Sequence, residues 1–423
     1  MTATEKSTGN AASGSDFDVV IVGGGAIGAT LALQLERLAY RVALIERSTP
    51  SFASTNPERV IALNYGSRCH LEKLGLWNDI TANGAGNIRH IVVTEPGNRG
   101  RVDLDAADET PAMDELGYVV EMGQLLAPIY RRLQESTVEM IAPASVRRFE
   151  RREQQVIMQI QRDGQASEIT AALLVGADGV NSQIRRQAGI GVSGWDYNRF
   201  GMVASVSCEQ GHANTAHECF RASGPLAFLP LADGRFSIVW AATPAEATQL
   251  LAMSDAQFIA ALSKAAGSAT MRKIGAITAT SRRANFPLEL TIANSFALPR
   301  LALVGNAAHT VHPVAGQGMN LGLRDVTALA AALDSELAHC DPGRSIVMQA
   351  YAEARRADTL AVAGFTECMV HVFGSAAPGV KWLRGMGLQT MPRAKRLSAL
   401  LLKQASGLAQ MREQHERQNG VAA

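Results

Sequence analysis

The sequence predicts an α/β fold in which a dinucleotide-binding domain with a parallel sheet is interrupted by an antiparallel β-sheet domain and followed by C-terminal helices. Three observations predict this fold. A strand, helix and strand with a glycine-rich turn open the chain at Asp18–Glu46. Short alternating strands separated by Gly-Pro and Asp-Gly turns fill Trp195–Trp240. From Ser345 onward the pattern is helical, with breaks at Gly374–Gly379 and Pro392.

The opening unit has the order and spacing of a Rossmann-like dinucleotide site. A buried apolar strand runs into the turn Gly23–Gly28 (GGGAIG), and a helix and a second strand follow. That strand ends at Glu46, an acid about 20 residues farther on, where such sites hold the ribose hydroxyls. We expect Gly23 to make the tight turn, Gly25 to admit the pyrophosphate and Gly28 to let helix and strand pack. A carboxylate at Glu46 repels a 2′-phosphate, so the site favours FAD or NAD over NADP.

Two further glycine turns each follow a predicted strand. The first is Gly176–Gly179 (GADG), which follows the strand Ile169–Val175. The second lies in Leu301–Val326, where a short apolar run stops at Gly305 and a helix begins near Met319. Turns that leave the parallel strands of one sheet meet at its carboxyl edge, where ligands bind. Free N–H groups at a helix start suit an electron-rich group, and beside a dinucleotide site the obvious candidate is a reduced flavin ring.

Composition limits the class of protein. The chain has 423 residues, enough for two or three packed lobes, and its net charge of +1 gives no reason to expect nucleic acid as a partner. Its five cysteines are scattered without CxxC spacing, which argues for a reducing compartment and against a disulfide framework or a thiolate metal site. No apolar run is long enough to span a bilayer, and the small polar residues of Met1–Ser15 predict a disordered tail rather than a signal peptide. These features indicate a cytoplasmic protein.

The order of the patterns divides the chain into a nucleotide-binding domain in three parts, a β-sheet substrate domain and two flanking regions. A polar stretch punctuated by Pro and Gly marks an insertion that belongs to the substrate lobe. The expected segments are a disordered tail at 1–15, FAD-binding parts at 16–93, 118–193 and 296–344, the insertion at 94–117, the β-sheet substrate domain at 194–295 and a C-terminal helical region at 345–423.

The three glycine motifs, in this order, resemble those of the aromatic-hydroxylase class of FAD monooxygenases, the group A flavin monooxygenases. More narrowly, the chain resembles the ubiquinone-biosynthesis hydroxylases, and within them the branch that acts on 2-polyprenyl-6-methoxyphenol. The resemblance runs from about Asp18 to about Leu402. The supporting local matches are RVIAL at Arg59–Leu63, LGLW at Leu74–Trp77, GYVVE at Gly117–Glu121, GWDY at Gly194–Tyr197 and GPLAFLPL at Gly224–Leu231.

The resemblance implies roles for individual residues. Arg59 and Gln124 would lie along the pyrophosphate and ribityl chain, and Asp178 would lie between the flavin and nicotinamide regions. The third motif usually begins Gly-Asp, but this chain has Asn306, which keeps hydrogen-bonding capacity with one negative charge fewer beside the flavin. The N–H groups of Met319 and Asn320, at the helix start, would meet N1 and the C2 carbonyl of the flavin and stabilise the reduced anion. The implied FAD-binding residues are Gly23, Gly25, Ala26, Ile27, Gly28, Glu46, Arg59, Gln124, Asp178, Asn306, Gly316, Gly318, Met319 and Asn320, with Pro313 and His309 as candidates for the flavin face.

The resemblance also implies the chemistry. NAD(P)H bound transiently, or another electron donor, reduces FAD, which adds O₂ to give a C4a-hydroperoxide whose distal oxygen passes to an electron-rich phenol ring. The implied substrate is a lipophilic polyprenyl-phenol, a ubiquinone precursor. No side chain stands out as a general base. His309 and His312 are spaced as H-x-x-H, but without a nearby carboxylate or cysteine they do not predict a metal site.

Other functions stay open. A small soluble aromatic could be the substrate, and a site lined by Arg and Tyr would favour that version. The chain could instead be a flavin-containing accessory subunit of a ubiquinone-biosynthesis complex, which the unusual Asn306 motivates. A plain NAD dehydrogenase would not need the second and third motifs.

The C-terminal region combines basic and apolar residues. Between Lys381 and Lys403, six Lys and Arg side chains lie among Trp, Leu and Met with no acid between them. Such a helix can lie on an anionic membrane surface, or it can cover the FAD domain with its charges in solvent. The residues alone favour the cover, and the polyprenyl substrate that the resemblance implies makes peripheral contact with the inner membrane an equal alternative.

Overall fold

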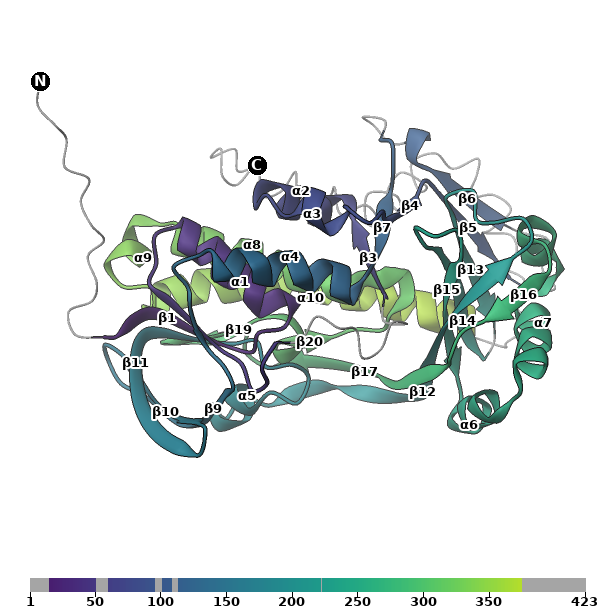
Figure 1. Cartoon of the computed structure of the whole chain (residues 1–423). Coiled ribbons are helices and arrows are strands. Elements are labelled where there is room, and N and C mark those ends of the chain that lie inside the picture. The colour runs from purple at the N-terminus through teal and green to yellow at the C-terminus, as the bar shows by residue number, and fades with distance from the viewer. Residues whose placement is uncertain (1–14, 51–59, 96–100, 109–112, 222, 375–423) are drawn as a thin grey trace, which may run out of the picture.

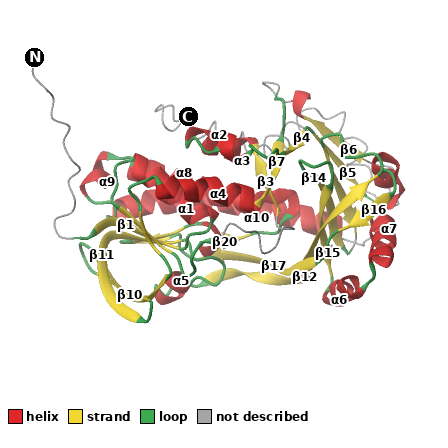
Figure 2. Cartoon of the chain, viewed as in Figure 1, coloured by secondary structure: helices red, strands yellow, loops and turns green. Residues whose placement is uncertain are grey.

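The computed structural model describes residues 15–50, 60–95, 101–108, 113–221 and 223–374. Residues 1–14 of the expected disordered tail, Arg59 and the basic apolar segment Lys381–Lys403 lie outside the described residues. Two large sheets occupy the two ends of an elongated molecule, and one long helix, α10 (Ser345–Gly374), runs along both (Figure 1). Most helices gather over the first sheet, and a smaller pair covers the outer face of the second (Figure 2).

The first sheet is mostly parallel. Its eight strands run in the order β18-β19-β11-β1-β2-β8, with β10 paired to β11 and β9 to β10. The pairs that join β19, β11, β1, β2 and β8 are all parallel. The strands are β1 (Phe17–Val22), β2 (Val42–Ile45), β8 (Glu139–Ile141), β9 (Ala144–Arg151), β10 (Val156–Arg162), β11 (Gln165–Gly176), β18 (Ala297–Leu298) and β19 (Leu301–Leu303).

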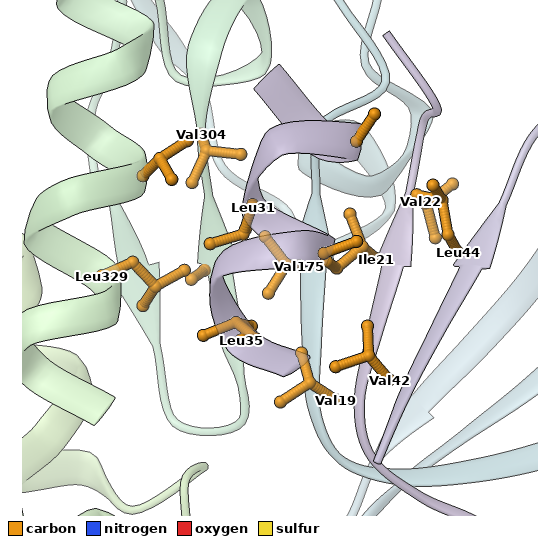
Figure 3. Close-up of a cluster of buried hydrophobic side chains, with 14 of the residues drawn as sticks. Val19, Ile21, Val22, Leu31, Leu35, Val42, Leu44, Val175, Val304 and Leu329 are labelled. Atoms are coloured by element: carbon orange, nitrogen blue, oxygen red, sulfur yellow. The ribbon is translucent and has the colours of Figure 1, made fainter. Parts of the chain in front are cut away.

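The hydrophobic core of this part lies between the sheet and two helices, α1 (Ala26–Arg37) and α8 (Gln317–Leu333). Leu31 and Leu35 of α1 and Leu329 of α8 belong to one buried cluster with the apolar strand residues (Figure 3). All three leucines are fully shielded from solvent. Burying each such side chain stabilises the fold by roughly 1.5–3 kcal/mol, so this contact fixes both helices on the sheet.

The second sheet is mainly antiparallel and contains nine strands in the order β20-β17-β12-β15-β14-β13-β5-β6, with β16 paired to β12. Helices α6 (Pro244–Ala252) and α7 (Asp255–Ile274) cover one of its faces through an apolar cluster. The strands are β5 (His90–Thr94), β6 (Arg101–Asp105), β12 (Val192–Cys208), β13 (Thr215–Arg221), β14 (Gly224–Pro230), β15 (Phe236–Ala242), β16 (Ile277–Thr280), β17 (Ala284–Ala293) and β20 (His309–Thr310).

The remaining elements connect the two large sheets. A small sheet joins β3 (Val60–Asn64), β7 (Gly117–Glu121) and β4 (Gly86–Ile88). Among the described helices, none combines the length and the apolar character that crossing a bilayer requires. The other helices are α2 (Tyr65–Lys73), α3 (Trp77–Ile80), α4 (Met122–Gln134), α5 (Gln183–Gln187) and α9 (Glu336–Cys340), with short 3₁₀ turns η1 (Ala106–Asp108), η2 (Gly305–Ala307) and η3 (Val314–Gly316).

The two sheets confirm the predicted fold class, a parallel nucleotide-binding sheet interrupted by an antiparallel sheet, with helices at the end of the described chain. The exact segment limits stay a prediction. Two strand positions refine the expectation. β5 begins at His90, before the expected insertion at 94–117, yet already pairs in the second sheet, and β12 is one strand of 17 residues rather than a series of short ones. One end of a strand this long can pair in the centre of the second sheet while the other end extends toward the first sheet.

A buried carboxylate on α8, Asp325, ties the third glycine motif to two helices. Its Oδ2 atom accepts a hydrogen bond of 2.7 Å from the N–H of Gly305 and lies 2.7 Å from Nε2 of His309. Its Oδ1 atom lies 2.6 Å from Nε of Arg355 on α10. Asp325 and Arg355 are both almost completely buried. Burial alone would raise the pKa of Asp325, but His309, Arg355 and the Gly305 N–H together hold it below its ordinary value.

Asp325→Ala is expected to lower the free energy of unfolding by about 3–5 kcal/mol, because it removes one of the two carboxylates paired with the buried Arg355 and leaves Gly305 N–H and His309 without their partner. Urea denaturation followed by circular dichroism measures this change. The matched control is Glu135→Ala, which removes an ion pair with Arg132 whose two side chains are about 60% exposed and which should cost no more than about 1 kcal/mol. Equal losses in the two variants would contradict a special role for the buried pair.

Candidate active site

Four strands of the first sheet end side by side. Val22 at the end of β1 lies opposite Ile45 of β2 and Gly176 of β11, and Gly176 lies opposite Leu303 of β19. The residues that follow these ends are the first glycine motif, Glu46, the second motif and the third motif. The structure therefore confirms that the three glycine turns meet at the carboxyl edge of one parallel sheet, where open α/β folds bind ligands.

The three glycines of the first motif meet different surroundings. A Cβ atom on Gly23 would lie 2.3 Å from the carbonyl oxygen of Ala177, and one on Gly28 would lie 2.0 Å from that of Gly23, so close backbone contacts exclude side chains at both. A Cβ atom on Gly25 would meet no protein atom within 4 Å, and this residue is exposed. Nothing in the described protein explains a glycine at position 25, whereas an external group lying against the backbone would.

Two long helices begin at this edge without the usual caps. Neither α1 nor α8 has a side-chain cap or an acid in its first turn. In contrast, α6 and α7 both begin with a complete capping box. The N–H groups of the first turn have no acceptor within a helix, so the positive ends of α1 and α8 are left to bind an anion or an electron-rich group.

Glu46 lies at the end of β2 beside the first motif. Its Oε2 atom accepts a hydrogen bond of 2.6 Å from the N–H of Gly24, and its Oε1 atom accepts from the backbone and hydroxyl of Ser48. The side chain remains partly exposed. Since each carboxylate oxygen has two lone pairs, Glu46 can hold the loop and still accept hydrogen bonds from ligand hydroxyls.

Ile27 joins the first motif to the third. A Cβ atom added to Gly305 would lie 3.3 Å from the Ile27 side chain, and one added to Gly322 of α8 would lie 2.8 Å from it. The Ile27 side chain therefore packs inside the protein, and only its backbone can serve a ligand. Ala26, the first residue of α1, is also buried. Asn306, in contrast, is exposed at the turn that follows β19.

The loop before α8 is shaped by glycine. Gly316 caps the helix in the left-handed conformation, with φ of 61°, and a Cβ atom there would lie 2.8 Å from that of Ala62. A Cβ atom on Gly318 would meet no protein atom within 4 Å. Gly318 and Met319 lie in the first turn, so their N–H groups are free of intrahelical bonds, whereas that of Asn320 faces the carbonyl of Gly316 one turn back. The free donors of α8 are therefore one residue earlier than expected.

Several expected cofactor residues use their side chains inside the protein. Asp178 holds the start of α5, since its carboxylate accepts from Oγ of the N-cap residue Ser182 at 2.5 Å and from the N–H groups of Gln183 and Ile184. Gln124 belongs to the capping box of α4 and its Oε1 atom accepts from the N–H of Glu121.

The side chain of Asn320 links α8 to the small sheet and to α2. Its Oδ1 atom accepts from Asn64 N–H and Ser67 Oγ, and its Nδ2 atom donates to the carbonyls of Ala62 and Gly316. All of the polar atoms of this amide are therefore engaged within the protein. Short polar side chains beside glycine turns satisfy loose backbone groups as readily as they bind ligands.

The two histidines of the third motif have different surroundings. His309 is buried and bonded to Asp325, so its ring does not face a ligand. His312 is also buried, which lowers its pKa to about 4 and keeps it neutral. Its Nδ1 atom accepts a hydrogen bond from Val314 N–H, and its ring packs edge-on against Tyr197 with 5.0 Å between centroids. Pro313, between His312 and η3, stays partly exposed and remains the candidate for the flavin face.

Sequence reasoning did not assign Arg185 a role in the site. Its guanidinium is buried and donates to the carbonyl of Ala307 at 2.8 Å and to that of Val180 at 2.9 Å. Arg185 therefore joins the second motif to the third. Arg185 lies three residues after Ser182, the cap of α5. This spacing could have indicated a residue that holds the second motif, but it is equally typical of an exposed helix.

A cavity of about 500 Å³ lies away from this edge of the first sheet, between β5, β6, β13 and α7. Its lining includes His90, His217 and Lys273 and no residue of the three glycine motifs. It faces the side of the second sheet that α7 covers, so it is not the site at which the three turns converge.

Comparison with known proteins agrees with this geometry. A family model described as an FAD binding domain matches residues 16–366. The chain is 35% identical to the 3-demethoxyubiquinol 3-hydroxylase of Escherichia coli over 92% of this chain and 98% of the relative. It is 34% identical to the ubiquinone hydroxylase UbiL of Rhodospirillum rubrum over 92% and 89% of the two chains.

Solved structures show the same fold. The p-nitrophenol 4-monooxygenase PnpA of Pseudomonas putida superimposes with a TM-score of 0.75 over 92% of this chain and 98% of its own, at 20% identity. That likeness concerns the fold alone. The extent of the family match and the identity to the two relatives go further: this chain is an FAD-dependent aromatic monooxygenase and belongs to the ubiquinone hydroxylase family.

Proposed function

We propose that the protein hydroxylates the phenol ring of a polyprenylated ubiquinone precursor of the 2-polyprenyl-6-methoxyphenol type. The observation that carries this substrate class is the face of the second sheet turned away from α6 and α7. That face belongs to an apolar cluster containing Phe220, Leu231 and Val314, and Val314 lies in the loop before α8. An apolar surface beside the ring-binding loop suits a lipophilic phenol better than a small charged aromatic.

Peripheral contact with the inner membrane from the cytoplasmic side, and a ubiquinone-biosynthesis complex as partner, belong to the same proposal. They are supported by the lipophilic substrate and by the basic apolar pattern of Lys381–Lys403, which the described residues do not include.

We infer the following arrangement of FAD from the open positions. The exposed backbone of Gly25 and the uncapped start of α1 would hold the pyrophosphate, and Glu46 the adenosine ribose. Asn306 would bind the ribityl chain, and the free N–H groups of Gly318 and Met319 would face the flavin ring. Bound FAD, reduced by NAD(P)H or another donor, supplies the activated oxygen.

The chain's own residues position and shield that chemistry. The start of α8 presents donors and a positive helix end where negative charge develops on the reduced ring. Asp325 and Arg185 hold the third motif so that these donors keep their direction. The apolar residues around Val314 exclude water from the ring, which protects reactive oxygen from wasteful reaction with solvent.

Gly25→Val is expected to weaken FAD binding at least about 100-fold, equivalent to about 2.7 kcal/mol, without unfolding the protein. The Cβ atom of the new side chain meets no protein atom within 4 Å, and the side chain would occupy the space assigned to the pyrophosphate. Flavin absorbance per protein and thermal melting of the cofactor-free form measure the two effects. Gly364→Val, at an exposed position of α10 that is equally open, is the control and should leave FAD binding unchanged. Full flavin content in Gly25→Val would contradict the assignment.

The substrate is tested with purified protein, FAD, NADH, NADPH and O₂. We expect 2-polyprenyl-6-methoxyphenol to gain one oxygen atom, detected by mass spectrometry, with ¹⁸O₂ as the source. Demethoxyubiquinol and soluble hydroxybenzoates are the comparison substrates. Product from demethoxyubiquinol alone would move the proposal to another ring position, and product from soluble aromatics alone would overturn the polyprenyl substrate.

A further inference from the structure

One carboxylate lies on the apolar face of the second sheet. Glu218 is the fourth residue of β13, between Ala216 and Phe220 on the same face of the strand. Both of these neighbours belong to the apolar cluster that contains Val314. On the opposite face of β13, His217, Cys219 and Arg221 point toward α7 and Trp240.

The residues across the sheet from Glu218 are apolar. Strand register places it beside Val93 of β5 and Ala227 of β14, and the same row continues through Val239 of β15 to Val203 of β12. Three of these four neighbours, like Glu218 itself, are only partly buried. In the row on the other face, Phe228 and Ile238 are completely buried, and only Val92 at its edge is partly exposed. The row with Glu218 is therefore incompletely covered, as a surface that receives a substrate would be.

The loop assigned to the flavin ring approaches this face. Val314 of η3 is buried in the same cluster as Ala216 and Phe220. The next residues lead through Gly316 to the first turn of α8, whose free N–H groups are assigned to the ring. Glu218 therefore lies on the same apolar face of the sheet against which the loop before α8 packs.

Glu218 has no hydrogen bond or ion pair with a described residue, although its surroundings are strongly desolvating. Burial raises the pKa of this carboxyl from 4.5 to about 7. Beta strands β4 and β14 bring no charged residue to this face. The ionisable groups on the other elements packed here are Glu95 after β5, Glu367 and His371 on α10, and His312 before η3.

None of those four groups forms an ion pair or hydrogen bond with Glu218. Glu367 bonds Tyr197 and His371, and Glu95 has a partner of its own. Burial keeps His312 neutral, as described above. An unpaired carboxyl on an apolar surface is costly to the fold, and such groups mark functional sites when they face a ligand.

We propose that the Glu218 carboxylate accepts a hydrogen bond from the hydroxyl of the phenol substrate and takes up its proton as the ring is oxygenated. This inference rests on the proposed function and supplies the general base that the sequence did not reveal. A base whose pKa lies near the working pH is the most effective, because enough of it is ionised and it still attracts the proton.

The proton and electron count is balanced. The phenol O–H bond breaks, the proton passes to a Glu218 oxygen, and the electron pair stays on the phenol oxygen and enriches the ring. The attacked ring carbon gains one oxygen atom of O₂. The other atom becomes water with the hydride of NAD(P)H, which would pass through FAD, and one proton from solvent, and the hydrogen that the ring carbon later loses returns to solvent as a proton. When that carbon loses its hydrogen as a proton, Glu218 returns its proton to the phenol oxygen and is ionised again.

The test is Glu218→Gln in the FAD-loaded enzyme, with a short-chain 2-prenyl-6-methoxyphenol and its methyl ether as probes. We expect kcat/KM for the phenol to fall about 100-fold in the variant, the lower range for loss of a general base. Wild-type kcat/KM should rise with pH through about 7, as the carboxylate forms, and the variant should lack this rise. The wild type should strongly prefer the phenol over its ether, and the variant should not.

Two controls separate a catalytic role from a structural one. Glu168→Gln, at an exposed glutamate of β11, should leave every kinetic value unchanged. Flavin content and melting temperature of Glu218→Gln should equal or exceed those of the wild type at pH 8, because the change removes a charge from an apolar face. If Glu218→Gln proves unstable, Glu218→Asp provides the same test, with a lower kcat and the pH dependence retained.

The outcomes distinguish this inference from the function on which it rests. If the wild type hydroxylates no phenol, the proposed function fails. If the wild type hydroxylates the probe and Glu218→Gln keeps its rate, its pH profile and its preference for the phenol, the role of Glu218 is overturned while the function stands.

Discussion

The position of the third glycine motif depends on one buried carboxylate. Asp325 is completely shielded, and its two oxygens bind the turn after β19, the ring of His309 and the guanidinium of Arg355. A charge at this depth is tolerable only when its lone pairs are occupied and a counter-ion is in contact. Because those partners come from three separate elements, the carboxylate fixes the angle at which α8 meets the edge of the sheet.

The rest of the site follows from that angle and from the parallel strands. Four strand ends in register bring together three turns that lie far apart in the sequence. Glycines then decide where the backbone may be approached. Neighbouring carbonyl groups occupy the space that a Cβ atom on Gly23 or Gly28 would need. The corresponding space beside Gly25 and Gly318, at the starts of α1 and α8, is free of protein atoms. The protein thus binds its cofactor mainly with backbone groups, and side chains such as Asp178 and Asn320 hold that backbone in place.

The parts that the sequence predicts correctly are local or periodic. The strand, turn and helix at Asp18–Glu46 lie within one continuous segment, so apolar spacing and glycine positions suffice. The pairing of β5 with β13 is long-range, and no local pattern reveals it. Asp178 and Gln124 show a second difficulty, since a polar residue beside a turn can cap a helix or bind a ligand and its identity does not distinguish the two. For Glu218 the signal was a lone acid in the strand TAHECFR, which only the register of five strands places on the apolar face.

The pairing of β5 with β13 also has a consequence for how the chain folds during its synthesis. Thr94 and Cys219 are hydrogen-bonded neighbours separated by 125 positions, and the intervening chain returns to the first sheet before β13 appears. During synthesis the hairpin of β5 and β6 must therefore wait with an unpaired edge while more than a quarter of the polypeptide is still to emerge. Exposed strand edges invite association with other chains, and contacts so distant slow folding. The second sheet is therefore completed only after β13 has been made, and the first sheet only after β19, so the two lobes complete their pairing late and together.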